Sequence, residues 1–181
     1  MTTCSDQGIT YIEMKIGAPK TKLAMRQYPD LKPEEAIYKM AEDLFSSVIA
    51  TIPATNETLI AEGKNPVDFR IVYALSKSAS RKGENLIQTR VLVRLLEAHP
   101  DWANYIVGLD GAAKEPGEPP YLYDNHLGLI HDYNASVPQE RQLGITWHQG
   151  EDFSDTSLMD SIMRVESLVD LDADRIGHAI A

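Results

Sequence analysis

The residues of this sequence best suited to chemistry are His148, Glu151 and His178. Glu151 follows His148 by three residues, with Gly150 in between. His178 follows the apolar residues of the next predicted strand. A neutral imidazole nitrogen is a good zinc ligand, and a carboxyl group in a partly desolvated site can donate a proton. His-x-x-Glu alone also suits a solvated surface loop, but a second histidine after a neighbouring strand favours a site shared by both.

The elements that must position these residues alternate between strand-like and helix-like segments. Runs of β-branched and other apolar residues predict five strands, over residues 9–16, 69–75, 106–110, 144–147 and 175–181. Helical periodicity predicts one helix that starts at Pro33 and buries Ile37, Met40, Ala41, Leu44, Phe45 and Val48. Further helices are predicted over 86–96 and 123–136, and one with Leu158, Ile162, Val165 and Val169 on one face. Residues 111–120, rich in glycine and proline, are predicted to form a loop.

This alternation is typical of βα units around a parallel sheet, either open or closed into a barrel. No Gly-x-Gly-x-x-Gly follows a strand, so a dinucleotide-binding fold has no support. Polar residues directly follow four of the apolar runs: Ser76, Asp110, His148 and His178. Because barrel enzymes keep their chemistry at the carboxyl ends of strands, we predict an α/β fold, a partial (β/α)8 TIM-type barrel with about five of eight strands. It would be one domain over residues 1–181, incomplete at both ends.

Composition narrows the class of partner. The 17 Lys and Arg against 27 Asp and Glu give a formal charge of −10, which disfavours nucleic acid and suits a small, nearly neutral substrate. Cys4 is the only cysteine, which excludes an intrachain disulfide and a Cys-rich zinc site. No apolar run is long enough for a membrane span and no signal peptide is evident, so we expect a cytoplasmic protein.

Two short motifs of this sequence, taken as a pair, resemble a known family pattern. Trp147-His148-Gln149-Gly150-Glu151, followed by a helix and then Asp174-Arg175-Ile176-Gly177-His178, resembles the paired motifs of adenosine and AMP deaminases. Tyr11-Ile12-Glu13-Met14-Lys15 is similar to the second-strand Tyr-x-Glu-x-Arg of that family, and Val107-Gly108-Leu109-Asp110 to its fourth-strand Gly-x-Asp. The resemblance covers nearly the whole chain.

The resemblance implies a zinc-dependent hydrolase that converts an adenosine-like purine nucleoside to its inosine-like product and ammonia. His148 would be a ligand of one zinc ion and Glu151 the proton donor to the purine ring. His178 would orient and deprotonate the zinc-bound water. Asp110 and Ala113 would border the substrate.

The departures from the family pattern are also informative. Gln149, Ala179, Lys15 and Ala113 stand where the family usually has Ala, Gly, Arg and Gly. The family's His-x-His, which supplies two zinc ligands, and its Asp-Asp pair are absent from this sequence, so we expect this chain alone to bind zinc weakly. One alternative is a catalytically inactive half-barrel that associates with itself or a complementing chain through open sheet edges. A second is another metal-dependent amidohydrolase.

The remaining candidates have simpler interpretations. His126 and His131 lie five residues apart, off the spacing of a helical metal pair, which favours structural or solvated roles. One further group could bind an anion, although a solvated strand-to-helix turn is the favoured interpretation: Ser76, Lys77, Ser78 and Arg81. The single cysteine excludes the other class of zinc deaminase, which needs Pro-Cys-x-x-Cys.

Overall fold

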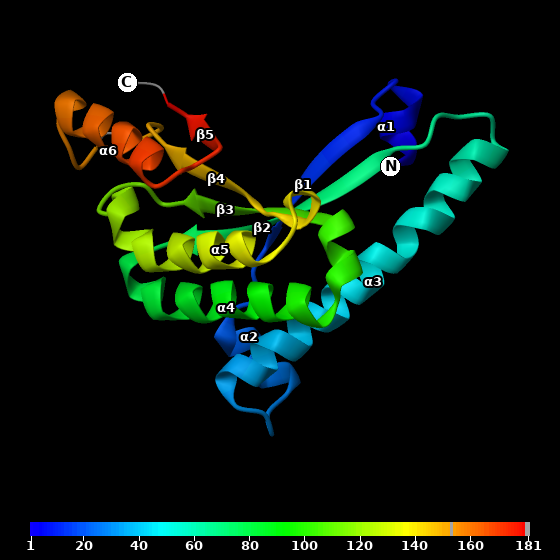
Figure 1. Ribbon diagram of the computed structural model, residues 1–181, viewed down its shortest axis with the longest axis horizontal. Helices are drawn as coiled ribbons and strands as arrows, with labels where there is room; N and C mark the ends of the chain where they lie inside the picture. Colours follow the sequence, from blue (N-terminus) through cyan, green and yellow to red (C-terminus); the bar gives the residue numbers. More distant parts are fainter. Residues whose placement is uncertain (153, 180–181) are drawn as a thin grey trace.

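Five parallel strands form the frame of the molecule in a computed structural model that describes residues 1–152 and 154–179 (Figure 1). They are β1 (Tyr11–Gly17), β2 (Asp68–Lys77), β3 (Ile106–Ala113), β4 (Gly144–Gln149) and β5 (Arg175–His178). Neighbours in sequence are neighbours in the sheet, which has the order β1-β2-β3-β4-β5. The predicted α/β class and five parallel strands are therefore confirmed.

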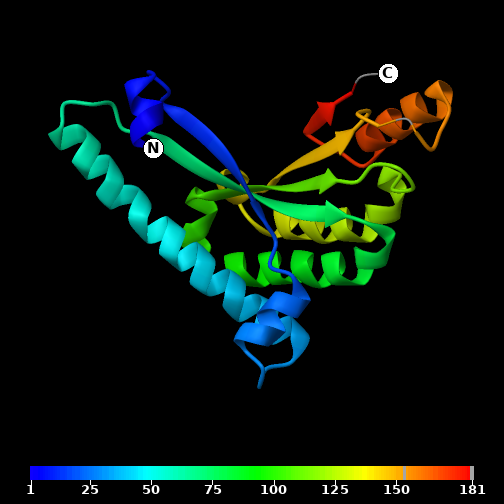
Figure 2. The same cartoon turned by 180° about the vertical axis from the view of Figure 1, so that it is seen from behind.

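Helices connect the strands. They are α1 (Thr2–Asp6), α2 (Thr21–Gln27), α3 (Pro33–Ala61), α4 (Lys82–Ala98), α5 (Asp124–Ser136) and α6 (Leu158–Asp170), with short 3₁₀ helices at Ala79–Arg81, Pro100–Asn104, Pro120–Tyr123 and Gln139–Arg141. Both ribbon views show α4 and α5 running along one face of the sheet (Figures 1 and 2). Among the described residues, no helix is both long and apolar enough to cross a membrane.

The core lies between this helical layer and the face of the sheet that meets it. The strands contribute alternate, fully buried side chains to it: Ile71, Tyr73, Leu75, Leu109, Ile145 and Trp147. The helices contribute Ile37, Ala41 and Phe45 of α3, Val91, Leu92, Leu95 and Leu96 of α4, and Leu127 and Ile130 of α5. The predicted apolar faces of α3 and α4 are therefore the faces that pack.

An ion pair between the two edge strands shows that the sheet is curled. In a flat sheet, four strand spacings would separate β1 from β5 by about 19 Å. Instead Arg175 Nη2 of β5 lies 2.6 Å from Glu13 Oε2 of β1. The sheet is therefore a half-barrel, with its apolar face turned to the helices and polar residues on its concave face.

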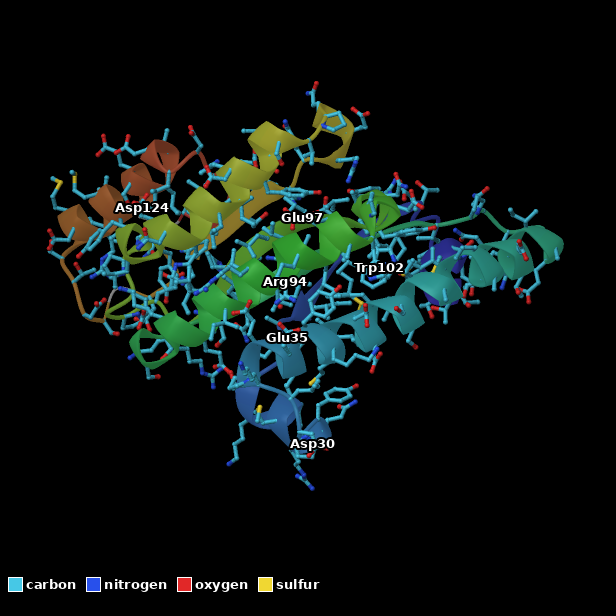
Figure 3. All side chains as sticks on the ribbon, turned by 60° about the horizontal axis from the view of Figure 1, so that its bottom comes forward. Asp30, Glu35, Arg94, Glu97, Trp102 and Asp124 are labelled. Atoms are coloured by element: carbon cyan, nitrogen blue, oxygen red, sulfur yellow. The ribbon has the colours of Figure 1, made fainter. Side chains whose placement is uncertain are left out.

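Charged contacts join α3 to α4 on the outside of the half-barrel. Figure 3 shows Arg94 of α4 beside Glu35 of α3, and the Arg94 guanidinium lies 3.0 Å from Glu34 and 3.1 Å from Glu35. It also covers the ring of Tyr38 at 4.8 Å. Because these groups are partly exposed, we expect each pair to contribute less than about 1 kcal/mol to folding.

Most predicted strands and helices differ from the structure by a few residues at their ends, and two of the differences are informative. The strand predicted over 106–110 continues to Ala113, because Gly111 is a strand residue rather than part of the loop. A Cβ at Gly111 would lie 2.5 Å from the ring of Trp147, so glycine is required for that indole to pack on the neighbouring strand. Helix α3 continues through Pro53 to Ala61, well beyond the predicted apolar face. Residues 180 and 181 of the last predicted strand lie outside the described residues.

Helix α6 has the predicted periodicity but packs on a different side. Ser161 and Leu168 are its buried residues. Its large apolar side chains are mostly exposed: Leu158, Met159, Ile162, Met163 and Val169. The apolar face that the sequence marks is therefore uncovered in the described chain.

The Gly111–Trp147 contact gives a test of the packing. We expect Gly111→Ala to lower the free energy of unfolding by about 1–3 kcal/mol, because the added methyl group displaces a buried indole. Urea denaturation measures this. Gly128→Ala in α5 is the control, since its Cβ would meet no atom within 4 Å and alanine favours a helix. Equal stability of Gly111→Ala and the parent chain would contradict the packing described.

Candidate functional site

The chemistry-bearing residues gather in and just beyond the carboxyl-terminal halves of β3, β4 and β5. Asp110 pairs in register with Thr146, and His148 with Gly177. A Cβ at Gly177 would come within 2.9 Å of the His148 ring, so glycine leaves room for the imidazole on the concave face. The half-barrel thus brings together the residues that the sequence placed on three separate strands.

Asp110 holds the His148 imidazole in one orientation. Its side chain is fully buried, with Oδ1 3.0 Å from His148 Nδ1 and Oδ2 2.9 Å from Lys15 Nζ. Lys15 Nζ also lies 3.2 Å from His148 Nε2. An ammonium group can only donate, so Nε2 is the accepting nitrogen and Nδ1 carries the proton that bonds to Asp110. A carboxylate behind one ring nitrogen is the usual arrangement of a metal-ligating histidine.

His178 and Glu151 form a second pair beside the first. The ring centroids of His148 and His178 are 5.3 Å apart, and His178 Nε2 lies 3.2 Å from Glu151 Oε2. The backbone of His178 has φ +72°, a left-handed conformation that is rare for a residue with a side chain. Such conformations cost about 1–3 kcal/mol and cluster at functional sites. An acid and a base therefore share one location next to His148.

Ala113 borders the same location. It ends β3 with φ +74°, a conformation suited to glycine, which is the residue that the deaminase pattern has there. A hollow of about 500 Å³ is lined by Ala113, Lys114, Glu115, Pro116, Glu151 and Asp152. The hollow thus joins Ala113 to Glu151, whereas Asp110 lies below, under His148. A direct contact of Asp110 with substrate stays a prediction.

Lys77 is buried beneath the site, so the prediction of a solvated turn was wrong for this residue. Its side chain is 1% exposed and its Nζ donates a hydrogen bond to the carbonyl oxygen of His148. Burial lowers the pKa of the Lys77 ammonium to about 8, against the attraction of Glu115 and other nearby carboxylates. The turn chemistry of the sequence gave no sign of this, because a lysine after a strand is usually solvated.

The residues present do not by themselves fit a catalytic zinc ion. Such an ion takes three protein ligands and keeps one position for water. Across residues 1–152 and 154–179, no group of three or more His, Cys, Asp or Glu side chains is arranged to hold a metal ion. The Lys15 ammonium also lies against Nε2 of His148, the atom that would bind the metal.

The two histidines of helix α5, His126 and His131, have structural roles. His126 Nε2 lies 3.1 Å from the carbonyl oxygen of Lys82, and His131 Nε2 lies 3.2 Å from that of Leu171. Burial lowers the pKa of His126, which therefore stays neutral more readily than an exposed histidine. The structural roles predicted for these two residues are confirmed.

Comparison of the chain with models of known protein families and with curated protein sequences gave no match. The case for a function therefore depends on the geometry of the site and on the motifs of the sequence.

The arrangement around Asp110 can be tested by stability. We expect Asp110→Ala to lower the free energy of unfolding by about 2 kcal/mol, because it removes the hydrogen bond to His148 and the ion pair with Lys15. Asp110→Asn, which keeps an acceptor for His148 Nδ1, should lose less. Chemical denaturation measures both, with the exposed Asp132→Ala of α5 as the control. An Asp110→Ala chain as stable as the control would show that Asp110 does not hold the site together.

Proposed function

We propose that this chain carries the proton-transfer half of a metal-dependent hydrolase that deaminates a purine nucleoside. The observation that carries the proposal is the pairing of His178 with Glu151 at 3.2 Å, beside a His148 ring whose Nε2 is directed away from its supporting carboxylate. An acid, a base and a candidate metal ligand are thus within reach of one small molecule.

The two paired groups suit the two proton transfers of hydrolytic deamination. Water must add to the carbon that bears the amino group, and ammonia must leave. The Glu151 carboxyl group would deliver a proton to the ring nitrogen and later recover one from the new hydroxyl group. The His178 imidazole would accept a proton from the attacking water and pass it to the amino group, which leaves as ammonia. Because the two groups lie in contact, a substrate that separates them would meet both.

Zinc is the cofactor that the resemblance implies, and this chain offers His148 as one ligand. The remaining ligands would have to come from residues outside those described, as in a complete (β/α)8 barrel, which we propose as the parent architecture. No step of the chemistry above depends on where they come from. A cytoplasmic location also stays a prediction.

A second candidate function is association without catalysis. The observation in its favour is the exposed apolar face of α6, with Leu158, Ile162 and Val169 uncovered next to the edge strand β5. Apolar patches and open strand edges are common sites of protein association. This interpretation predicts a stable complex of two or more chains and no turnover.

Ammonia release separates these candidates. The chain, within a complete barrel that supplies the remaining zinc ligands, is loaded with zinc, desalted, and incubated with adenosine, AMP, adenine and a pterin, while light scattering reports the mass of the chain alone. We expect ammonia from a purine nucleoside, and a fall of more than about two orders of magnitude in His148→Ala, since a metal lowers such barriers by several kcal/mol.

His131→Ala is the matched control, because His131 bonds to a backbone carbonyl on α5 and should keep full activity. Equal turnover in His148→Ala and the parent chain would contradict the assignment. Release from the pterin alone would favour another amidohydrolase, and an oligomer that releases no ammonia would favour association.

A further inference from the structure

The turn that follows β4 is held by one buried carboxylate from the preceding loop. Oε2 of Glu115 accepts hydrogen bonds from the backbone N–H groups of Gly150, Glu151 and Asp152, at 2.9, 3.0 and 3.3 Å. The side-chain amide of Gln149 lies 3.4 Å from the same oxygen. Glu115 is only 2% exposed. Four consecutive residues, including the candidate proton donor, thus converge on a single oxygen atom.

This geometry is that of an anion held in a backbone nest. Successive N–H groups that point to one place favour a negative charge there, and hydrogen bonds to an ionised acceptor are stronger than neutral ones. Gly150, with φ +89°, lets the backbone turn so that the three N–H groups align. The anion in this nest is supplied by the chain itself, 35 residues before Gly150.

Lys77 balances the charge on the other side of the turn. Its ammonium donates to the carbonyl oxygen of His148, and Glu115 is the carboxylate that attracts this ammonium most strongly. Both kinds of backbone group in residues 148–152 are therefore bound by a side chain. Lys77 donates to one carbonyl oxygen, and Glu115 accepts from three N–H groups. A buried carboxylate needs such compensation to remain ionised.

The Glu151 side chain has little else to define its position. It is 58% exposed, and its carboxyl group contacts His178 Nε2 at 3.2 Å. The direction in which it points is therefore set by the backbone of the turn, which Glu115 holds.

We propose that Glu115 is a positioning residue, which fixes the turn after β4 so that the Glu151 carboxyl group faces His178. The catalytic part of this inference rests on the proposed function. The structural part, the order of residues 150–152, does not.

Amide hydrogen exchange in the full chain tests the structural part. In Glu115→Ala we expect the amides of residues 150–152 to exchange at least about tenfold faster, while those of α4 keep their rates. Glu115→Gln keeps an oxygen acceptor without the charge, so it should be intermediate, and it serves in place of Glu115→Ala if that variant does not fold.

Asp155→Asn is the matched control, because Asp155 also accepts a backbone bond from this loop, from Gly117 at 2.6 Å, and its carboxylate pairs with Arg164 of α6. Its exchange at residues 150–152 should equal that of the parent chain. Unchanged exchange in Glu115→Ala, or equal acceleration in Asp155→Asn, would overturn the proposal.

Turnover tests the catalytic part. If the parent chain deaminates a nucleoside, Glu115→Ala should lower kcat at least about tenfold with KM within about twofold, and Glu115→Gln should recover part of the loss. Unchanged kcat would overturn the positioning role. Absence of turnover in the parent chain when the remaining zinc ligands are supplied would instead overturn the proposed function, and the exchange rates would then decide whether Glu115 orders the turn.

Discussion

The half-barrel depends on how the chain accommodates one buried carboxylate, that of Asp110. A carboxylate without solvent is strongly unfavourable unless it is paired and hydrogen-bonded, and Asp110 meets this condition through Lys15 and His148. Asp110 lies on β3, whereas Lys15 lies on β1 and His148 on β4, so the three residues span four neighbouring strands. The sheet must therefore curl for all three to meet. The Glu13–Arg175 pair across the edge strands is consistent with the same curvature.

Curvature also divides the molecule into two environments. Alternate strand residues face the helices and form an apolar core around Tyr73, Leu109 and Trp147, all of them buried. The residues between them face the concave side, where Lys15, Asp110 and His148 meet. Because the helical layer supplies the stability, the concave face is free to hold polar groups whose burial would otherwise destabilise the fold.

Much of this arrangement could be predicted from the sequence, because periodicity and strand-end placement carry the information. The five strands, the packed faces of α3 and α4, and the meeting of His148, Glu151 and His178 all follow from local patterns. The hydrogen bonds from the N–H groups of residues 150–152 to Glu115 could not be predicted. A carboxylate that binds a turn 35 residues away leaves no periodic signal in the sequence. Lys15 could have been found, because Glu13 and Lys15 share one face of β1 by alternation. The exposed face of α6 could not, since periodicity marks an apolar face but not what covers it.

Asp110 holds His148 with the ring proton on Nδ1, so that the Nε2 lone pair is the one that faces Lys15 on the concave side of the sheet. Long-range proton–nitrogen NMR correlation of the histidine rings tests this most directly, because it distinguishes the two neutral tautomers and the charged form. We expect His148 to show a protonated Nδ1 and an unprotonated Nε2 at neutral pH. A proton on Nε2 would contradict the account, because that nitrogen could then neither accept a bond from Lys15 nor bind a metal ion.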